Sequence, residues 1–282
     1  MTIPVDPALV DRAAVDPALV DPALNAGSSI LTHRHSDFVA SDLVSAKAGA
    51  RVTVCIPARD EERTIGAIVS AVRSDLVEAL PLVDEVIVVD DRASDATAAE
   101  AQHCGATVLQ GPGLGKGEAM RLARGRGDYV VFLDGDVENF GSHFVTGLLG
   151  TLLSDERIVL VKGSYARPLS QSGAGGGRVT ELVARPLISL MFPELAGVAQ
   201  PLAGETAVRS QVLDKVELSG GYGVEMGLLL DTWSIWGVEA IAQVELGERR
   251  HRNRPLAELG PQAREVIAAA LERAGLPGIA NS

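Results

Sequence analysis

Apolar residues follow two alternating patterns along residues 50–275. Short apolar runs predict buried strands at 51–57, 84–90, 106–109, 129–133, 158–162 and 241–246. Apolar residues spaced three or four apart predict helices that begin near 60, 94 and 118 and helices over 142–153, 224–235 and 261–274. The glycine-rich loop 175–181 is predicted to enter a further helix that runs through Leu190. Strands and helices alternate, so we predict an α/β fold with a mostly parallel, doubly wound sheet and helices on both faces.

The chain divides into three parts by composition. Residues 1–49 contain the sequence Asp-Pro-Ala-Leu three times, and their closely spaced prolines forbid a long helix, so we expect a tail of low order. A first helix at 41–48 would lead from this tail into the domain. Residues 50–165 carry the regular alternation and are predicted to bind a nucleotide. Residues 166–282 are less regular and are predicted to form a smaller second part.

The run from Tyr129 to Leu133 reads as a strand buried on both faces, and it ends in Asp134, Gly135 and Asp136. Open α/β sheets place their ligand crevice at the carboxyl ends of the strands. Two carboxylates so close together repel unless a cation lies beside them, and Mg²⁺ or Mn²⁺ with a phosphate-bearing ligand suits such oxygens. An acidic turn that merely ends a strand is the alternative.

Other strand ends carry polar groups to the same edge. Pro57, Ala58, Arg59, Asp60 and Glu61 follow the first strand. Asp90 and Asp91 end the second one. Acids at such positions bind the base and ribose of a nucleotide in dinucleotide folds, and the convergence favours that role over simple turn formation.

Two glycine-rich segments have the composition of anion sites. Lys116 lies in the loop 111–117 at a helix start, where it could contact a diphosphate or remain a surface lysine; no Ser or Thr follows it, as a Walker A motif requires. Gly177, Arg178, Val179 and Thr180 combine exposed backbone N–H groups, a guanidinium and a hydroxyl at a helix start. A small phosphate or carboxylate would fit there, whereas a flexible linker is the alternative.

Charge and composition exclude some classes of protein. The net charge of −12 argues against a nucleic-acid partner, so the basic cluster at 249–254 is expected to face anionic substrates. His251 within it could bind a cation. Two cysteines without a CxxC motif indicate reduced thiols in the cytoplasm, and no apolar stretch is long enough to span a membrane.

These segments together resemble a known family. The segments Val54–Glu62, Val88–Thr97, Gly115–Ala119 and Asp134–Asp136 are similar to GT-A glycosyltransferases with their DxD motif. The segments Gly175–Leu187, Gly221–Glu225, Ile241–Val244 and His251–Leu256 resemble the actinobacterial glucosyl-3-phosphoglycerate synthases. The likeness covers residues 50 to about 275 and implies a GT-A fold with a smaller C-terminal part that binds the acceptor.

The resemblance implies a metal-dependent enzyme that transfers glucose from UDP-glucose to the 2-hydroxyl of 3-phosphoglycerate with retention of anomeric configuration. The implied donor-binding residues are Pro57, Ala58, Arg59, Asp60, Glu61, Asp91, Lys116, Asp134, Gly135, Tyr222, Gly223, Val224, Glu225, Arg249 and Arg254. The implied acceptor-binding residues are Gly177, Arg178, Val179, Thr180 and Asn253. Asp136 and His251 would bind Mg²⁺ or Mn²⁺, and the catalytic residues would be Glu225, Asp136 and Arg249.

The implied mechanism is front-face attack, in which Arg249 and the metal neutralise the departing diphosphate and Glu225 orients the sugar. A covalent intermediate on Glu225 is the alternative. A homodimer is also implied. Arg59, Asp60 and the pair Asp91–Arg92 depart from the family pattern, and the segment 170–174 is short. A GDP-mannose or GDP-glucose donor, another acceptor, or a non-catalytic nucleotide-sugar binder therefore stays open.

Overall fold

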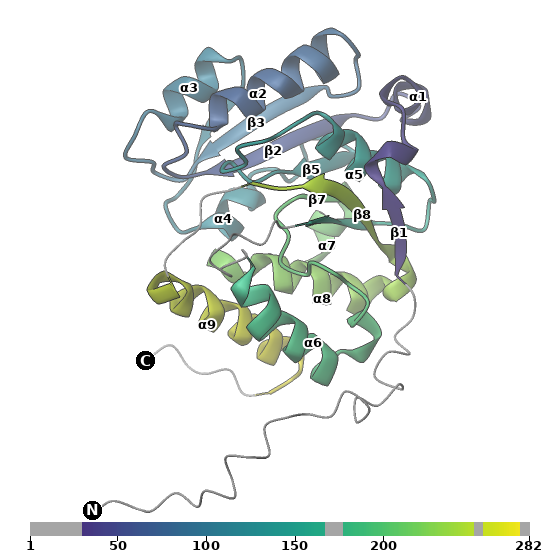
Figure 1. Ribbon diagram of the computed structural model, residues 1–282, viewed down its shortest axis with the longest axis vertical. Helices are drawn as coiled ribbons and strands as arrows, with labels where there is room; N and C mark the ends of the chain where they lie inside the picture. The colour runs from purple at the N-terminus through teal and green to yellow at the C-terminus, as the bar shows by residue number, and fades with distance from the viewer. Residues whose placement is uncertain (1–29, 167–176, 251–255, 277–282) are drawn as a thin grey trace, which may run out of the picture.

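A computed structural model describes residues 30–166, 177–250 and 256–276 of the chain. Eight strands form one sheet in the order β1-β8-β6-β7-β5-β2-β3-β4 (Figure 1). The strands are β1 (Leu31–Arg34), β2 (Val52–Ala58), β3 (Glu85–Asp90), β4 (Thr107–Gln110), β5 (Tyr129–Phe132), β6 (Leu160–Ala166), β7 (Thr206–Arg209) and β8 (Ile241–Glu248). All neighbours pair in parallel except β7, which runs antiparallel to β5 and β6. The prediction of a mostly parallel α/β sheet is confirmed.

Helices cover both faces of this sheet. The α-helices of the described residues are α1 (Ala40–Ala46), α2 (Ile65–Arg73), α3 (Thr97–His103), α4 (Lys116–Arg121), α5 (His143–Leu153), α6 (Arg185–Met191), α7 (Ser210–Lys215), α8 (Val224–Trp236) and α9 (Leu256–Arg273). Shorter helical turns are η4 (His35–Asp37), η5 (Ser74–Glu78), η6 (Thr180–Ala184), η7 (Pro193–Leu195), η8 (Gly221–Gly223) and η9 (Val238–Ala240). None of the helices in these ranges is long and apolar enough to cross a membrane.

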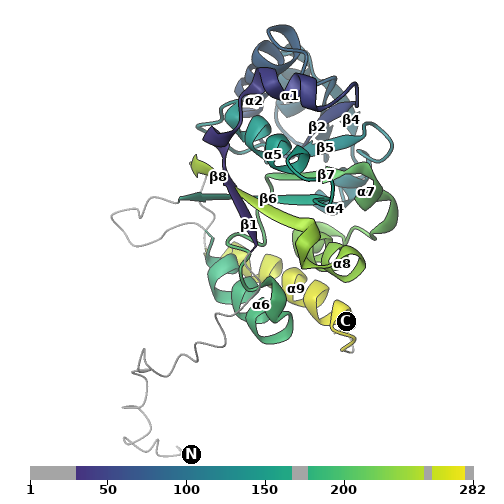
Figure 2. The ribbon, with the colours of Figure 1, turned by 90° about the vertical axis from the view of Figure 1, so that its right-hand side faces the viewer.

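The sheet separates two hydrophobic cores. Helices α1, α2, α3 and α5 pack on one face, whereas α4 and α6 to α9 pack on the other (Figure 2). Consecutive residues of β5 alternate between the cores, with Val131 in the first and Val130 and Phe132 in the second. A strand covered on both faces needs a continuous apolar run, which is why the sequence pattern identified it.

The prediction of a low-order tail is wrong for the last part of residues 1–49, which belongs to the folded domain. Within the predicted tail 1–49, the described residues include β1 and α1, and β1 pairs with β8 at the edge of the sheet, with Leu31 opposite Ala242. Three of the four residues of β1 are exposed, so its short, polar sequence carries no strand pattern. Only the pairing with β8, more than two hundred positions away, makes it a strand.

Some predicted element boundaries and elements also differ. The helix expected from Asp60 begins at Ile65 instead, because Asp60 has a left-handed backbone (φ 59°) and its carboxylate accepts a hydrogen bond from the Ser94 N–H at 2.7 Å. The helix expected to follow the loop 175–181 and to run through Leu190 divides into η6 and α6. Pro186 lacks the N–H that a continuous α-helix would use there. The four-residue β7 was not predicted.

Candidate active site

A pocket of about 340 Å³ opens at the carboxyl ends of β2, β3 and β5 and is closed on its other side by η6, η8 and α9. Most residues predicted for the site line this pocket. They are Pro57, Ala58, Arg59, Glu61, Asp91, Lys116, Asp134, Gly135, Asp136, Gly177, Arg178, Val179, Thr180, Tyr222, Glu225 and Arg249. Parts of the chain far apart in sequence therefore meet at one site, as the convergence of strand ends predicted.

Other predicted site residues lie elsewhere. Asp60 is not among the residues lining the pocket, because its carboxylate binds the Ser94 backbone and hydroxyl at 2.7 and 3.0 Å. Gly223 and Val224 are buried at the start of α8 and do not line the pocket. The predicted His251, Asn253 and Arg254 lie outside the described residues.

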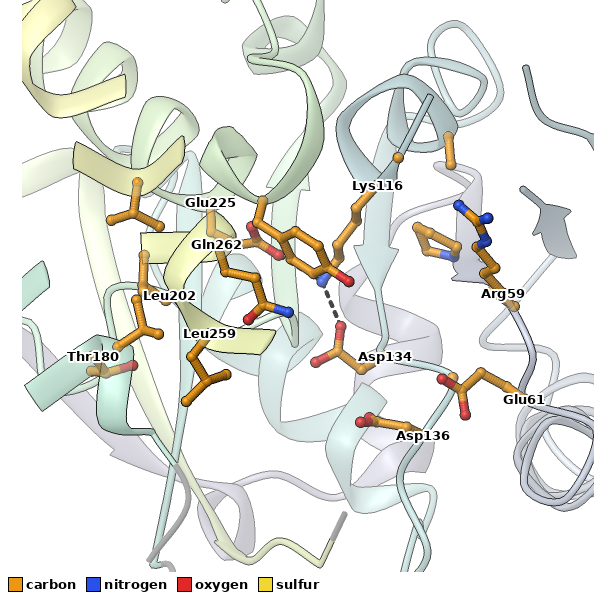
Figure 3. A pocket seen from close by; sticks show the side chains of 18 of the residues that line it. Arg59, Glu61, Lys116, Asp134, Asp136, Thr180, Leu202, Glu225, Leu259 and Gln262 are labelled. Atoms are coloured by element: carbon orange, nitrogen blue, oxygen red, sulfur yellow. Dashed lines mark hydrogen bonds and ion pairs between the residues drawn. The ribbon is translucent and has the colours of Figure 1, made fainter. Parts of the chain in front are cut away.

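The acids at the end of β5 are paired with cations of the protein itself. Lys116 donates to Asp134 Oδ1 at 2.5 Å and lies 2.6 Å from Glu225 Oε1 (Figure 3). Arg249 Nη2 contacts Asp134 Oδ2 at 2.7 Å and Asp136 Oδ1 at 2.9 Å. The positive charges of Lys116 and Arg249 therefore offset the repulsion between Asp134 and Asp136, which the sequence analysis expected a cation to offset.

These contacts shift the proton equilibria of both cations. Burial alone would lower the pKa of Lys116, but the carboxylates of Asp134 and Glu225 raise it. Burial also opposes the charge of Arg249, whereas Glu205, Tyr165, Asp134 and Asp136 raise its pKa well above the usual range. Both side chains are consequently cationic at neutral pH.

Asp91 shapes the loop that carries Lys116. Its buried carboxylate accepts hydrogen bonds from the N–H groups of Gly113 at 2.7 Å and Gly115 at 2.9 Å. Gly115 has φ 101°, which favours glycine, and a Cβ there would lie 3.0 Å from Gly221 Cα. The loop thus holds Lys116 at the start of α4, directed at the carboxylates.

The glycine-rich segment before η6 forms the opposite part of the pocket. Gly177 has φ 87°, and its carbonyl accepts the N–H of Glu181 at 2.9 Å, so the chain turns sharply into the helix. Arg178 is half-buried and Thr180 is buried, and both line the pocket. A guanidinium, a hydroxyl and a helix start at one wall are the groups that bind a small anion.

Several lining residues were missed by the sequence interpretation. They are Gly115, Ala119, Leu202, Leu259, Gln262 and Val266. The helix expected over 261–274 begins five residues earlier, at Leu256, and α9 brings Leu259 and Gln262 to the pocket. The amphipathic pattern of α9 was visible in the sequence. Such a pattern shows that one face of a helix is buried, but it does not show which part of the protein covers that face.

The chemistry of the acidic end suits a hard divalent cation. Asp136 lines the pocket with carboxylate oxygens, the ligands that Mg²⁺ and Mn²⁺ prefer. Within the described residues, no three His, Cys, Asp or Glu side chains are grouped to hold a metal by themselves. Such an ion would need further ligands, as Mg²⁺ typically obtains from substrate phosphates.

Comparison with known proteins identifies the relatives of this chain. Residues 53–173 match the model of the glycosyl transferase family 2. A glucosyl-3-phosphoglycerate synthase of Mycolicibacterium paratuberculosis is 47% identical over 257 residues, which cover 85% of this chain and 77% of the relative. The synthase of Petrotoga mobilis is 41% identical over 241 residues, or 80% of this chain and 74% of that protein.

Solved structures extend the likeness to the whole fold. The crystal structure of the Mycobacterium tuberculosis synthase with Mn²⁺, UDP-glucose and phosphoglyceric acid is 44% identical, with a TM-score of 0.82 and coverage of 89% of each chain. The same enzyme with Mn²⁺, UDP and glucosyl-3-phosphoglycerate gives a TM-score of 0.81 at 45% identity. The identity to relatives that are covered over most of their length shows that this chain belongs to the glucosyl-3-phosphoglycerate synthase family.

Proposed function

We propose that this protein transfers glucose from UDP-glucose to the 2-hydroxyl of 3-phosphoglycerate and gives glucosyl-3-phosphoglycerate with retained anomeric configuration. One observation carries the proposal: a single pocket joins the acid–cation group of Asp134, Lys116 and Arg249 to the anion-binding segment 177–180. The reaction needs these two kinds of site side by side. Relatives whose structures hold UDP-glucose and phosphoglyceric acid support the same conclusion.

The donor would lie along the strand ends. In this proposal Pro57, Ala58, Arg59, Glu61 and Asp91 surround the nucleoside, and Asp60 supports their loop through Ser94. The glucosyl-diphosphate part would meet Lys116, Asp134, Gly135, the segment 222–225, Arg249 and Arg254. The part 50–165 then supplies most of the donor site and the part 166–282 most of the acceptor site.

Asp136 and His251 would hold Mg²⁺ or Mn²⁺. When bound, such an ion neutralises negative charge that develops on the leaving diphosphate. The carboxylate of Asp136 fits this role because it lines the pocket and supplies oxygen ligands, although the ion would compete for it with Arg249 Nη2, which contacts it at 2.9 Å.

The chain's own residues would stabilise the leaving group and orient the sugar. Arg249 places a buried positive charge beside the position of the diphosphate, where charge develops as the bond from the anomeric carbon to oxygen breaks. Glu225, fixed by Lys116 at 2.6 Å, would orient the sugar hydroxyls. The acceptor oxygen attacks from the side that UDP leaves, and its proton passes to the departing diphosphate oxygen.

The acceptor would lie against the segment 177–180. Arg178 offers charged hydrogen bonds to the phosphate or carboxylate of 3-phosphoglycerate, and Thr180 offers a hydroxyl at the start of η6. Gly177 and Val179 supply backbone beside them, and Asn253 would complete the site. We further propose that the enzyme works as a cytoplasmic homodimer, with the exposed Leu182 and Leu190 in the interface.

Turnover of the purified protein tests the proposal. The assay contains UDP-glucose, 3-phosphoglycerate and Mg²⁺ or Mn²⁺, with product identification by mass spectrometry and NMR, and GDP-glucose and GDP-mannose run in parallel. We expect metal-dependent α-configured glucosyl-3-phosphoglycerate. Donor hydrolysis without transfer would contradict the acceptor assignment, and no donor use would contradict the catalytic one.

A further inference from the structure

A short unpredicted segment, Ala203–Thr206, forms the back wall behind the two aspartates. It leads into β7, which pairs with β6 so that Lys162 lies opposite Thr206. Gly204 packs directly against Asp134, because a Cβ at position 204 would lie 2.0 Å from Asp134 Oδ1. No side chain at position 204 could coexist with Asp134 in this position.

The next residue, Glu205, contacts the arginine of the site from behind. Its Oε1 accepts a hydrogen bond from Arg249 Nε at 2.8 Å, while Arg249 Nη2 reaches forward to Asp134 and Asp136. The guanidinium carbon also lies 5.3 Å from the centre of the Tyr165 ring. The guanidinium is therefore held at its inner nitrogen and along its face, which restricts where its outer nitrogens can reach.

Glu205 is fully buried, and the burial of a carboxylate costs free energy of folding. Its exposed fraction is 0%, and its Oε2 has no hydrogen-bond partner among the residues that the structure describes. The neighbouring Lys162 is also buried, but it donates to Ala203 O at 2.6 Å and to Thr206 Oγ1 at 3.1 Å. Buried ion pairs are weak contributors to stability compared with apolar packing, so the pair with Arg249 calls for another explanation.

We propose that Glu205 is a positioning residue of glucosyl transfer, which acts by fixing the Arg249 guanidinium in the orientation that meets the donor diphosphate. This inference rests on the proposed function and adds to it a residue outside the pocket lining. Glu205 touches neither donor nor acceptor; its effect passes through Arg249 Nε.

A double-mutant cycle tests the inference on the full-length protein. Glu205→Gln, Arg249→Ala and the double variant are compared with the wild type in kcat/KM for UDP-glucose. We expect Glu205→Gln to lower kcat/KM by ~10-fold or more in the wild type and by less than ~2-fold in the Arg249→Ala background. Equal losses in both backgrounds, or no loss in the wild type, would overturn the proposal.

UDP affinity, measured by calorimetry without acceptor, gives a second readout. Removal of a buried negative charge by itself would strengthen the binding of anionic UDP, so weaker binding to Glu205→Gln reports a displaced arginine. We expect Glu205→Gln to bind UDP ~5-fold more weakly than the wild type, and we expect this weakening to be absent or reversed in the Arg249→Ala background. Tighter binding when Glu205→Gln is the single substitution would refute the positioning role. Wild-type protein that binds UDP and makes no product would contradict the proposed function, while the UDP cycle would still decide about Glu205.

Two further variants guard against loss of folding. Glu239→Gln is the matched control, since Glu239 is exposed and lies 3.9 Å from Arg157, and it is expected to leave turnover and UDP binding unchanged. Thermal melting accompanies every variant. If Glu205→Gln does not fold, the same cycle is run with Glu205→Asp, which keeps the charge and shortens the reach to Nε.

Discussion

The two walls of the pocket differ in how their charges are satisfied. On the strand side, Arg249 contacts both Asp134 and Asp136 and Lys116 contacts Asp134, at distances of 2.5 to 2.9 Å. On the opposite side, the apolar Leu202 and Leu259 lie near Thr180 and Gln262 (Figure 3). Arg178 and Val266 also line the pocket. The strand wall thus consists mainly of acidic and basic side chains in contact with each other, whereas the other wall also contains several apolar side chains.

Under the proposed assignment of donor and acceptor, this difference predicts how each ligand binds. A diphosphate on the strand side must exchange partners with carboxylates that already hold Arg249 and Lys116, so binding depends on a delicate balance of charges. A phosphoglycerate on the other side mainly gains hydrogen bonds at a helix start, without breaking an ion pair at the strand ends. Substitutions on the two walls should therefore change different kinetic constants.

Of the substitutions proposed here, Asp136→Ala should have the largest effect on activity. An Asp136→Ala protein with little loss of activity would contradict the assignment of the donor to the strand side. We expect kcat with UDP-glucose to fall by ~10³-fold, because the variant loses the carboxylate assigned to the divalent ion and one partner of Arg249. Initial rates at saturating Mg²⁺ measure the effect. Glu138→Ala, an exposed acid two residues further on, is the control. Full turnover by Asp136→Ala would refute its role in metal binding.

Lys162→Met tests whether the buried Lys162 behind the strand wall has a lowered pKa in the folded protein. Burial lowers the pKa of Lys162 from 10.5 to about 8. Between pH 8 and 10.5 the folded chain loses this proton while the unfolded chain keeps it, so the free energy of unfolding rises with pH, by about 3 kcal/mol from this one group.

Urea unfolding at pH 7.5 and 10.5 measures this contribution as the difference between the wild type and Lys162→Met. We expect the wild type to gain stability relative to the variant as pH rises. Lys215→Met, at an exposed lysine, should show no such change. A wild type that gains no stability relative to Lys162→Met over this range would show that the pKa of Lys162 is not lowered in the folded protein.

Arg178→Ala tests the opposite wall. The loss of a charged hydrogen bond to the acceptor should raise KM for 3-phosphoglycerate by ~30-fold and leave KM for UDP-glucose within ~2-fold. Steady-state kinetics with each substrate varied in turn measure both constants. Arg185→Ala removes an exposed arginine from the same helical segment and serves as the control. An equal rise in both KM values would mean that the walls do not divide the substrates.

Thr180→Val should have the smallest effect. It keeps the shape of a buried side chain at the start of η6 and removes one hydroxyl, so we expect KM for 3-phosphoglycerate to rise by ~5-fold with kcat little changed. Thr180→Ser, which keeps the hydroxyl, should restore most of the wild-type KM. Failure of Thr180→Ser to do so would indicate that the methyl group matters more than the hydroxyl.

The strand side of the site could be predicted from the sequence because its signals are local. A buried strand such as β5 is a continuous apolar run, and parallel strands bring the residues after their carboxyl ends to one edge. Lys116 and Arg178 were recognised because glycine-rich segments at helix starts expose backbone N–H groups. Each of these features is written within a few consecutive residues.

Other features needed the folded chain. Gln262 and Leu259 reach the pocket only because α9 packs across the site, and Glu205 meets Arg249 over a separation of 44 positions. The strands β1 and β7 were not recognised in the sequence, and their place in the sheet is known only from their pairing, β1 with β8 and β7 with β5 and β6.

By itself, the sequence determined the fold class, the acidic sheet edge and the place of the segment 177–180 in the pocket lining, because local periodicity and turn chemistry encode them. Only the tertiary structure decided which cation meets which carboxylate, and that Lys116 and Arg249 share Asp134. Pairings of this kind depend on distances between segments far apart in the chain, and no local pattern contains those distances.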